Sequence, residues 1–291
     1  MAPLSDNVRG AALMAASMAG FAINDALVKT LAGALPVYQV MFLRGLFASA
    51  FLALLAWRAG ALWPTVEPAD RSRLIWRTTA EIGATSCFLT ALFHMPLANA
   101  TAILQALPLA VTLGAAIFLR EAVGWRRYSA ILIGFLGVLI IVRPGAEGFN
   151  VYAISALAAV AFIVVRDLTT RRLTTGVPSL FVALASAVAI TGAGGLASLG
   201  LEWRSVGGDE VIRLGFAAVF LIGGYLFAVM TMRVGDISFI SPFRYTVLLW
   251  AIMLGFFVFG EVPDTWTLVG STVVVIMGIY TFYRERKLAG R

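Results

Sequence analysis

Charged and polar side chains occur inside several stretches of this sequence that are otherwise apolar. The first stretch, residues 9–30, contains Asn24, Asp25 and Lys29. Asp25 and Lys29 are four residues apart, so they could pair on one face of a helix. A carboxylate held away from water can bind the charged part of a solute, or take up and release a proton near neutral pH. Asp25 is therefore a candidate proton-linked group, and a structural ion pair at a helix end is the alternative.

Two further charged residues, Arg44 and Glu81, stand in the interior of apolar stretches. Glu81 could pair with Arg77, which precedes it by four residues, or both side chains could extend to the lipid headgroups. Arg44 has no comparable route to a headgroup, which favours a position in a cavity or between helices.

Prolines interrupt two other apolar stretches at corresponding places. Pro108 follows Gln105 in one stretch, and Pro242 precedes Arg244 and Tyr245 in the other. Backbone freed by a proline inside a membrane is tolerated where it faces protein or a water-filled cavity. Matched interruptions therefore indicate a central binding site, although ordinary membrane helices also contain proline.

Aromatic residues could complete such a site, with Tyr225 and Trp250 forming an apolar or stacking wall. Gln105 and Tyr245 would supply hydrogen bonds, while Arg244 would attract an anionic or carbonyl-rich group. The full set of predicted binding residues is Asn24, Asp25, Arg44, Gln105, Tyr225, Arg244, Tyr245 and Trp250.

The composition excludes several other kinds of site. The chain is 60% apolar and only 13% charged, whereas soluble domains carry roughly 25% charged residues. The single cysteine, Cys87, and the single histidine, His94, exclude a disulfide framework and a paired-histidine zinc motif. We expect neither a metal nor a cofactor. The net charge of +7 does not indicate a nucleic-acid partner, because the basic residues are spread over short loops.

The apolar stretches predict an all-α integral membrane protein with ten transmembrane helices. A helix that crosses the hydrocarbon core needs about 17 to 25 residues. The predicted spans are residues 9–30, 37–57, 74–93, 98–119, 126–143, 150–168, 178–199, 214–232, 238–259 and 265–283.

The two halves of the chain repeat one another, which indicates an internal duplication. Equivalent residues recur at an interval of 140 to 142 residues: Glu121 and Glu261, Trp125 and Trp266, Gly137 and Gly278, Asp25 and Asp167, and Pro36 and Pro178. Each copy, residues 1–146 and 147–291, holds five predicted spans. Because five is odd, the copies must be inverted relative to one another, as is typical of secondary transporters. Glu121 and Glu261 would each bind a basic residue, at opposite membrane faces.

The basic residues favour one orientation in the membrane. With the N-terminus inside, sixteen Lys and Arg residues lie on the cytoplasmic side and four on the other side. Positive residues are enriched in cytoplasmic loops. We therefore expect a multi-pass inner-membrane protein with both termini in the cytoplasm.

This pattern resembles the EamA-type carriers of the drug/metabolite transporter superfamily over essentially the whole chain. The resemblance is carried by residues 108–121, Gly134, Gly137 and Pro144, and by residues 241–261 and Gly278. Residues 24–29, 35–36 and 39–45 are similar to a bacterial branch with riboflavin and S-adenosylmethionine-like carriers. The resemblance implies a cavity walled by the first, third, fourth, sixth, eighth and ninth helices, and a homodimer contact at the fifth and tenth.

The sequence thus predicts a carrier that moves a small organic metabolite by alternating access, with Asp25 and Glu81 as candidate coupling residues. The solute could be a vitamin such as riboflavin, or a nucleoside-like or amino-acid-like compound. Export by the same fold is the first alternative. An integral-membrane enzyme is the second, but the sequence has no visible catalytic constellation.

Overall fold

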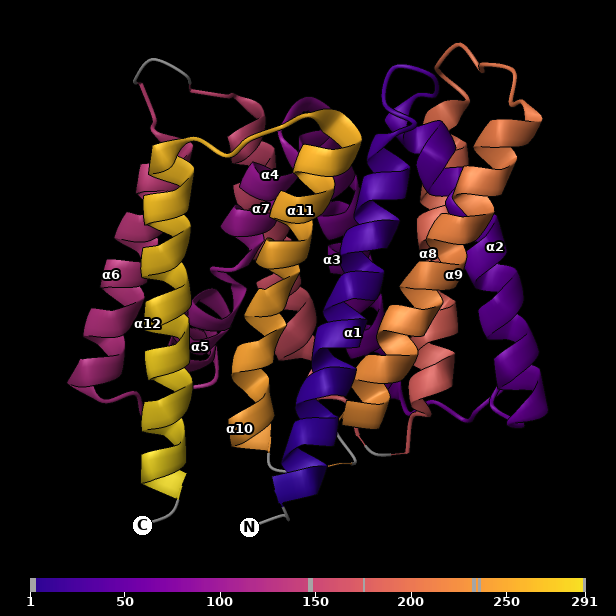
Figure 1. Ribbon diagram of the computed structural model, residues 1–291. Helices are drawn as coiled ribbons and strands as arrows, with labels where there is room; N and C mark the ends of the chain where they lie inside the picture. Colours follow the sequence, from indigo (N-terminus) through magenta and orange to yellow (C-terminus); the bar gives the residue numbers. More distant parts are fainter. Residues whose placement is uncertain (1–3, 146–148, 175, 232–233, 235–236, 290–291) are drawn as a thin grey trace.

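The fold is a bundle of helices, seen in a computed structural model that describes residues 4–145, 149–174, 176–231, 234 and 237–289 (Figure 1). The first helices are α1 (Leu4–Lys29), α2 (Val37–Arg58), α3 (Pro68–His94), α4 (Leu97–Leu104), α5 (Leu107–Phe118) and α6 (Trp125–Val142). The others are α7 (Tyr152–Thr170), α8 (Ser179–Ser198), α9 (Gly208–Thr231), α10 (Ile237–Ile240), the 3-10 helix η1 (Ser241–Tyr245), α11 (Thr246–Phe259) and α12 (Thr265–Ala289).

Each predicted span coincides with one helix or with consecutive helical segments. Within the described ranges, nine helical stretches are long and apolar enough to cross a membrane. The remaining predicted span lies in α3, which is 27 residues long; Arg77 and Glu81 lower its hydropathy. The predicted repeat boundary at residues 146 and 147, and the predicted end of the eighth span at residue 232, lie outside the described residues.

Two spans are interrupted where the prolines predicted it. The first is divided into α4 and α5, and Pro108 occupies the first turn of α5. A proline has no N–H and is tolerated at this position, where the N–H would lack a helical partner. In the second, η1 contains Pro242 in its first turn and separates α10 from α11. The prediction of interrupted helices is confirmed.

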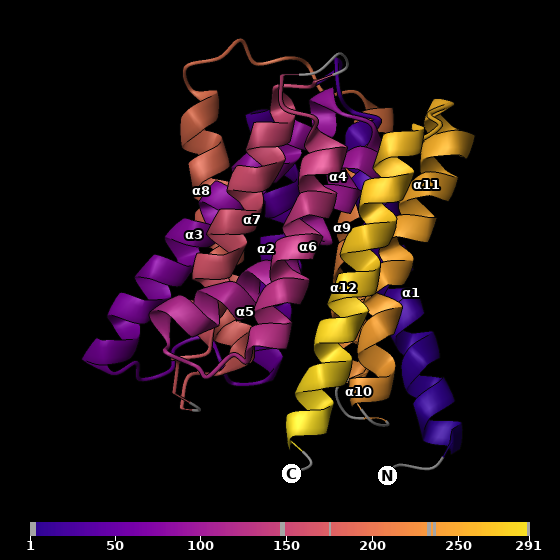
Figure 2. The same cartoon turned by 90° about the vertical axis from the view of Figure 1, so that its left-hand side faces the viewer.

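The helices associate in pairs along their length. The most extensive contacts join α1 to α9, α3 to α7, α2 to α8, and α6 to α12. The pair α6 and α12 lies at one end of the bundle and the pair α2 and α8 at the other (Figures 1 and 2). Glycine permits the close approach of α6 and α12, because a Cβ at Gly137 would lie 2.9 Å from the carbonyl oxygen of Gly270.

The same turn follows α5 and α11. Arg120 and Gly260 both adopt left-handed backbone conformations, with φ values of 55° and 66°. The next residue then donates its N–H back to the helix, Glu121 to the Ala115 carbonyl (3.3 Å) and Glu261 to the Gly255 carbonyl (2.9 Å). Such a turn satisfies carbonyls that a helix end leaves free. The turn after α5 lies at the end of the bundle with both chain termini, and the turn after α11 at the opposite end (Figure 1).

Candidate functional site

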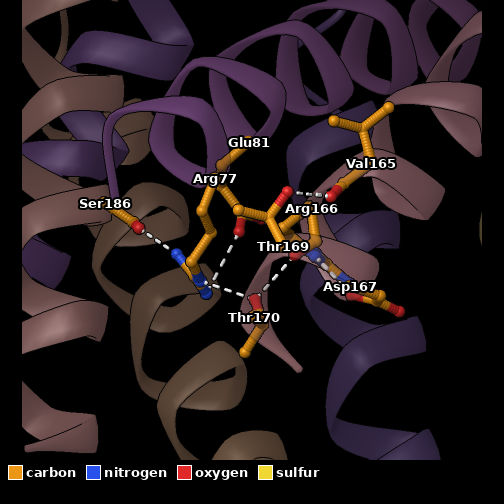
Figure 3. A network of polar contacts seen from close by, with 8 residues as sticks. All are labelled: Arg77, Glu81, Val165, Arg166, Asp167, Thr169, Thr170 and Ser186. Carbon is orange, nitrogen blue, oxygen red and sulfur yellow. Dashed lines mark hydrogen bonds and ion pairs between the residues drawn. The ribbon is translucent and has the colours of Figure 1, made fainter. Parts of the chain in front are cut away.

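A network of charged side chains joins α3 to α7 (Figure 3). Arg166 Nη1 donates a hydrogen bond to Glu81 Oε1 (2.9 Å), and Arg166 Nε donates to Asp167 Oδ1 (2.8 Å). Arg77 forms a second ion pair with Glu81, with 3.5 Å between Nη2 and Oε2. The Glu81 side chain is only 13% exposed, so its charge is stabilised mainly by these two guanidinium groups.

Arg77 extends this network to α8. Its Nε donates to the hydroxyl of Thr170 (3.0 Å), and its Nη1 donates to the hydroxyl of Ser186. Figure 3 shows the guanidinium of Arg77 between Ser186, Thr170 and Glu81. Since ionisable groups within a membrane are costly unless they are paired, these bonds hold Arg77 and Glu81 in one arrangement.

A second polar group joins α1 to α2. Arg44 Nη1 lies 3.4 Å from Asn24 Oδ1, and Asn24 Nδ2 donates to Asp25 Oδ1 (2.9 Å). Asn24 is only 2% exposed and so connects the cation to the carboxylate inside the bundle. Arg44 is also within electrostatic range of Asp25 itself.

Tyr225 of α9 is near both groups. Its ring stacks edge to face on Phe21 of α1, with the ring centroids 5.2 Å apart. Its phenol is within electrostatic range of Arg44 from the second group, and of Glu81 and Arg166 from the first. The residue nevertheless exposes 56% of its surface, so the ring borders open space instead of filling the core. Charged groups from both halves of the chain therefore lie near an accessible aromatic ring.

Two glycines bring the helices of this cluster together. A Cβ at Gly83 of α3 would lie 2.8 Å from the ring of Phe162 in α7, and a Cβ at Gly224 of α9 would lie 2.9 Å from the ring of Phe21 in α1. A side chain at either position would push the helices apart, because real Cβ atoms do not approach rings so closely. The glycines thus position Glu81 and Tyr225.

The structure brings five of the predicted functional residues into this cluster: Asn24, Asp25, Arg44, Glu81 and Tyr225. The predicted pairing of Glu81 with Arg77 is observed. The predicted pairing of Asp25 with Lys29 is wrong, because Lys29 Nζ pairs with Glu261 Oε1 (2.9 Å) and donates to the Met95 carbonyl.

The other four predicted residues have different neighbours. Gln105 is buried and donates to the Thr101 carbonyl of its own helical segment (3.2 Å). Tyr245 is directed at Gly278 of α12, and its buried hydroxyl has no hydrogen-bond partner among the described residues. Arg244 is exposed. Trp250 packs against the cluster that contains Met18 of α1.

The cluster also contains residues that the sequence reasoning missed as binding candidates, namely Arg166, Asp167 and Ser186. The internal repeat could have identified them. Arg166 and Asp167 stand 142 residues after Asn24 and Asp25, and Ser186 stands 142 residues after Arg44.

The expected ion pairs of Glu121 and Glu261 are both present. Arg171 Nη1 lies 3.3 Å from Glu121 Oε1, and Lys29 Nζ lies 2.9 Å from Glu261 Oε1. Arg171 stands 142 residues after Lys29, so the two pairs are equivalent in sequence. Each pair joins one half of the chain to the other half.

Comparisons with known proteins agree with this architecture. Residues 8–143 match the EamA-like transporter family. The chain is 24% identical to the S-adenosylmethionine uptake transporter of Rickettsia felis over 94% of this chain and 92% of that protein. It is 27% identical to a pseudopaline exporter of Pseudomonas aeruginosa over 88% and 89%. It is 28% identical to a riboflavin transporter of Vibrio cholerae over 68% and 67%.

A protein of known crystal structure shares the fold, with a TM-score of 0.63 and 20% sequence identity over 97% of this chain and 99% of that one. The matched family, the names of the relatives and the apolar helices agree on a multi-pass membrane protein. The match over residues 8–143 and the names of the relatives together support a membrane metabolite transporter similar to the EamA-type carriers of the drug/metabolite transporter superfamily, and not an enzyme.

Proposed function

We propose that this chain is an inner-membrane secondary transporter that moves a small organic metabolite by alternating access through the cluster around Tyr225. The observation that carries the proposal is that Arg44, Glu81 and Arg166 lie within electrostatic range of the phenol of Tyr225, an accessible aromatic residue in an apolar bundle. Charged groups at such depth are costly, and their usual role is on the path of a solute or an ion.

Two inverted repeats would supply the alternating motion. The helix pairs support this arrangement. In the order of the two halves, α1 corresponds to α7, α2 to α8, α3 to α9 and α6 to α12. If the halves are exchanged, the contact of α1 with α9 therefore becomes the contact of α7 with α3, while the pairs α2 with α8 and α6 with α12 stay the same. A two-fold axis in the membrane plane has this property, and carriers with such an axis bind their substrate where the repeats meet.

The two equivalent ion pairs would close the opposite faces in turn. Lys29 with Glu261 and Arg171 with Glu121 each tie the repeats together, but at opposite ends of the bundle (Figure 1). A rocking motion that separates the repeats at one face must break the pair at that face and can keep the other pair.

The cluster suits a solute that carries both a ring and charged groups. Tyr225 offers an aromatic face, while Arg44 and Asp25 offer opposite charges beside it. Relatives that transport S-adenosylmethionine and riboflavin support a nucleoside-like or vitamin-like compound, and an amino-acid-like compound would also match these charges. Relatives include both uptake carriers and an exporter.

The proposed orientation has both termini in the cytoplasm, because this places sixteen basic residues on the cytoplasmic side. Both ends of the chain lie at one end of the bundle, as this orientation requires (Figure 2). We also propose a homodimer through the outer faces of α6 and α12, which expose large apolar residues such as Leu132, Leu136 and Ile276.

A ligand screen followed by transport tests the proposal. Vitamins, nucleosides and amino acids are screened for compounds that raise the unfolding temperature of the purified protein. A compound that binds is then loaded into proteoliposomes, where a carrier shows saturation and counterflow. Arg44→Gln and Tyr225→Ala should each raise the apparent dissociation constant of the solute at least about tenfold. Arg213→Gln, whose partly exposed side chain pairs with Asp209, should not. Unchanged constants in both cluster variants would show that the solute binds elsewhere.

A further inference from the structure

We propose that a groove between α3, α5 and α7 binds an anionic phospholipid from the bilayer. The groove has a volume of about 710 Å³ and is lined mainly by apolar side chains. Three of these, Trp76, Phe118 and Val165, are 64%, 67% and 42% exposed, so they lack protein neighbours on the groove side. In a membrane-spanning bundle, the occupant of such a surface is an acyl chain.

The charges of the groove select the headgroup. Arg73 from α3 and Arg172 from the segment after α7 both line it. Arg73 Nη1 donates a hydrogen bond to Asp70 Oδ1 (2.8 Å), and Arg172 Nη2 donates one to the Phe118 carbonyl (3.2 Å). A guanidinium has five N–H donors, so both side chains keep donors for a phosphate. Basic residues in pockets between transmembrane helices attract anionic headgroups in this way.

Trp76 adds a position at the membrane interface. It stands one helical turn from Arg73 on α3, and tryptophan prefers the headgroup level of the bilayer. Two guanidinium groups and an indole therefore meet one end of an apolar groove, which is the order of groups along a phospholipid.

The internal repeat provides a built-in comparison. Positions 140 to 142 residues from Trp76 hold Phe216, Ala217 and Ala218, and those from Arg172 hold Thr30, Leu31 and Ala32, whereas Arg73 corresponds to Arg213, Leu214 or Gly215. Trp76 and Arg172, and with them the pair of guanidinium groups beside an indole, are thus particular to one copy. We infer that the groove between α3, α5 and α7 binds the anionic lipid and that its counterpart in the other half does not.

Brominated lipids test both the position and the charge preference. Dibromo-phosphatidylglycerol and dibromo-phosphatidylcholine are compared as quenchers of tryptophan fluorescence in mixed micelles of the purified protein. We expect saturable quenching by phosphatidylglycerol, with a component that disappears in Trp76→Phe. In the double variant Arg73→Gln, Arg172→Gln, the preference for phosphatidylglycerol over phosphatidylcholine should fall roughly 10- to 30-fold.

The matched control is Arg71→Gln, Arg126→Gln, which removes the same charge from exposed residues that do not line the groove. This variant should keep the preference. An equal loss in both double variants would show unspecific attraction to the protein surface and overturn the proposal. Quenching that is the same in Trp76→Phe as in the wild type would also overturn the proposal. If the groove variants still bind the lipid but lose solute transport, the groove belongs to the solute and the proposal is overturned as well. Unfolding temperatures of all variants establish that they remain folded.

Discussion

Lys29 of α1 forms an ion pair with Glu261, the residue after the left-handed turn that ends α11. Glu261 Oε2 also accepts the N–H of Leu97 (2.8 Å), the first residue of α4. The lysine and glutamate side chains are 9% and 25% exposed, whereas those of the equivalent pair, Arg171 and Glu121, are 51% and 50% exposed. The two pairs are equivalent in sequence but differ in how far water screens them.

We expect Glu261→Gln to destabilise the protein more than Glu121→Gln. The first change leaves the largely buried Lys29 without its carboxylate partner, at a cost of about 1–3 kcal/mol. The second breaks an exposed pair that contributes less than about 1 kcal/mol. Thermal unfolding in detergent measures both. Equal losses of stability would mean that the difference in exposure has no energetic consequence.

Glu81→Gln should strongly slow transport. Glu81 neutralises two guanidinium groups, those of Arg77 and Arg166, and the amide cannot do so. We expect at least about a tenfold loss of transport rate in proteoliposomes. We also expect a loss of stability of about 3 kcal/mol, the lower end of the cost of breaking a buried ion pair. The exposed Glu67→Gln is the control. A Glu81→Gln variant with normal transport would show that the network only holds α3 to α7.

Asp25→Asn tests proton coupling. Asp25 has Asn24 and Arg44 as its polar neighbours, since Lys29 is engaged by Glu261. If protonation of Asp25 accompanies solute movement, transport by Asp25→Asn should no longer vary with pH, while the unfolding temperature changes little. The measurement is the initial rate of transport at pH values from about 5.5 to about 8.5, roughly the range in which a carboxylate inside a membrane can exchange protons. An unaltered pH profile would leave Asp25 as a structural partner of Arg44.

Gly83→Ala and Gly224→Ala should weaken the packing that positions the cluster. Each Cβ would meet a phenylalanine ring, at 2.8 Å for Phe162 and 2.9 Å for Phe21. Such overpacking costs about 1–3 kcal/mol. Gly223→Ala is the matched control, because no heavy atom lies within 4 Å of the place that its methyl group would occupy. Comparable unfolding temperatures for Gly224→Ala and Gly223→Ala would contradict the proposed close approach of α1 and α9.

Nine of the spans could be predicted from the sequence because they are long apolar runs within the described residues, and the one in α3 because its charges, Arg77 and Glu81, are few. The interruptions could be predicted because Pro108 and Pro242 cannot donate a helical hydrogen bond. The partner of Lys29 could not be predicted from the sequence. Spacing along one helix makes Asp25 the nearest carboxylate, and only the tertiary fold brings Glu261 closer. Arg166 looks like an ordinary basic residue at a cytoplasmic boundary, because it stands near a helix end, and only its place 142 residues after Asn24 distinguishes it in the sequence.

The binding residues could be predicted only in part for a similar reason. Matched positions in the two repeats led to Gln105 and Tyr245, yet equivalence in sequence does not determine which way a side chain is directed. Tyr245 is directed at Gly278, where the absence of a side chain leaves room for its ring. Tyr225, by contrast, borders open space beside the charged groups.

Asp70→Asn should lower stability at neutral pH but not in acid. Asp70 lies in the first turn of α3, ahead of the membrane span, and accepts hydrogen bonds from Thr174 and Arg73. The bond from Thr174, followed by that from Arg73, holds the pKa of Asp70 below its usual value, against the opposing effect of burial. A carboxyl group whose pKa is lowered by folding stabilises the protein above its unfolded pKa of about 3.9, and this stabilisation is lost as the pH falls through the folded pKa. The wild-type protein should therefore unfold at a higher temperature than Asp70→Asn at pH 7, and the difference should shrink as the pH falls below about 4. Glu67→Gln, close by and exposed, should show no such difference. A gap that stays constant down to the lowest pH at which the protein is folded would mean that the shape of the side chain, and not its charge, stabilises this helix start.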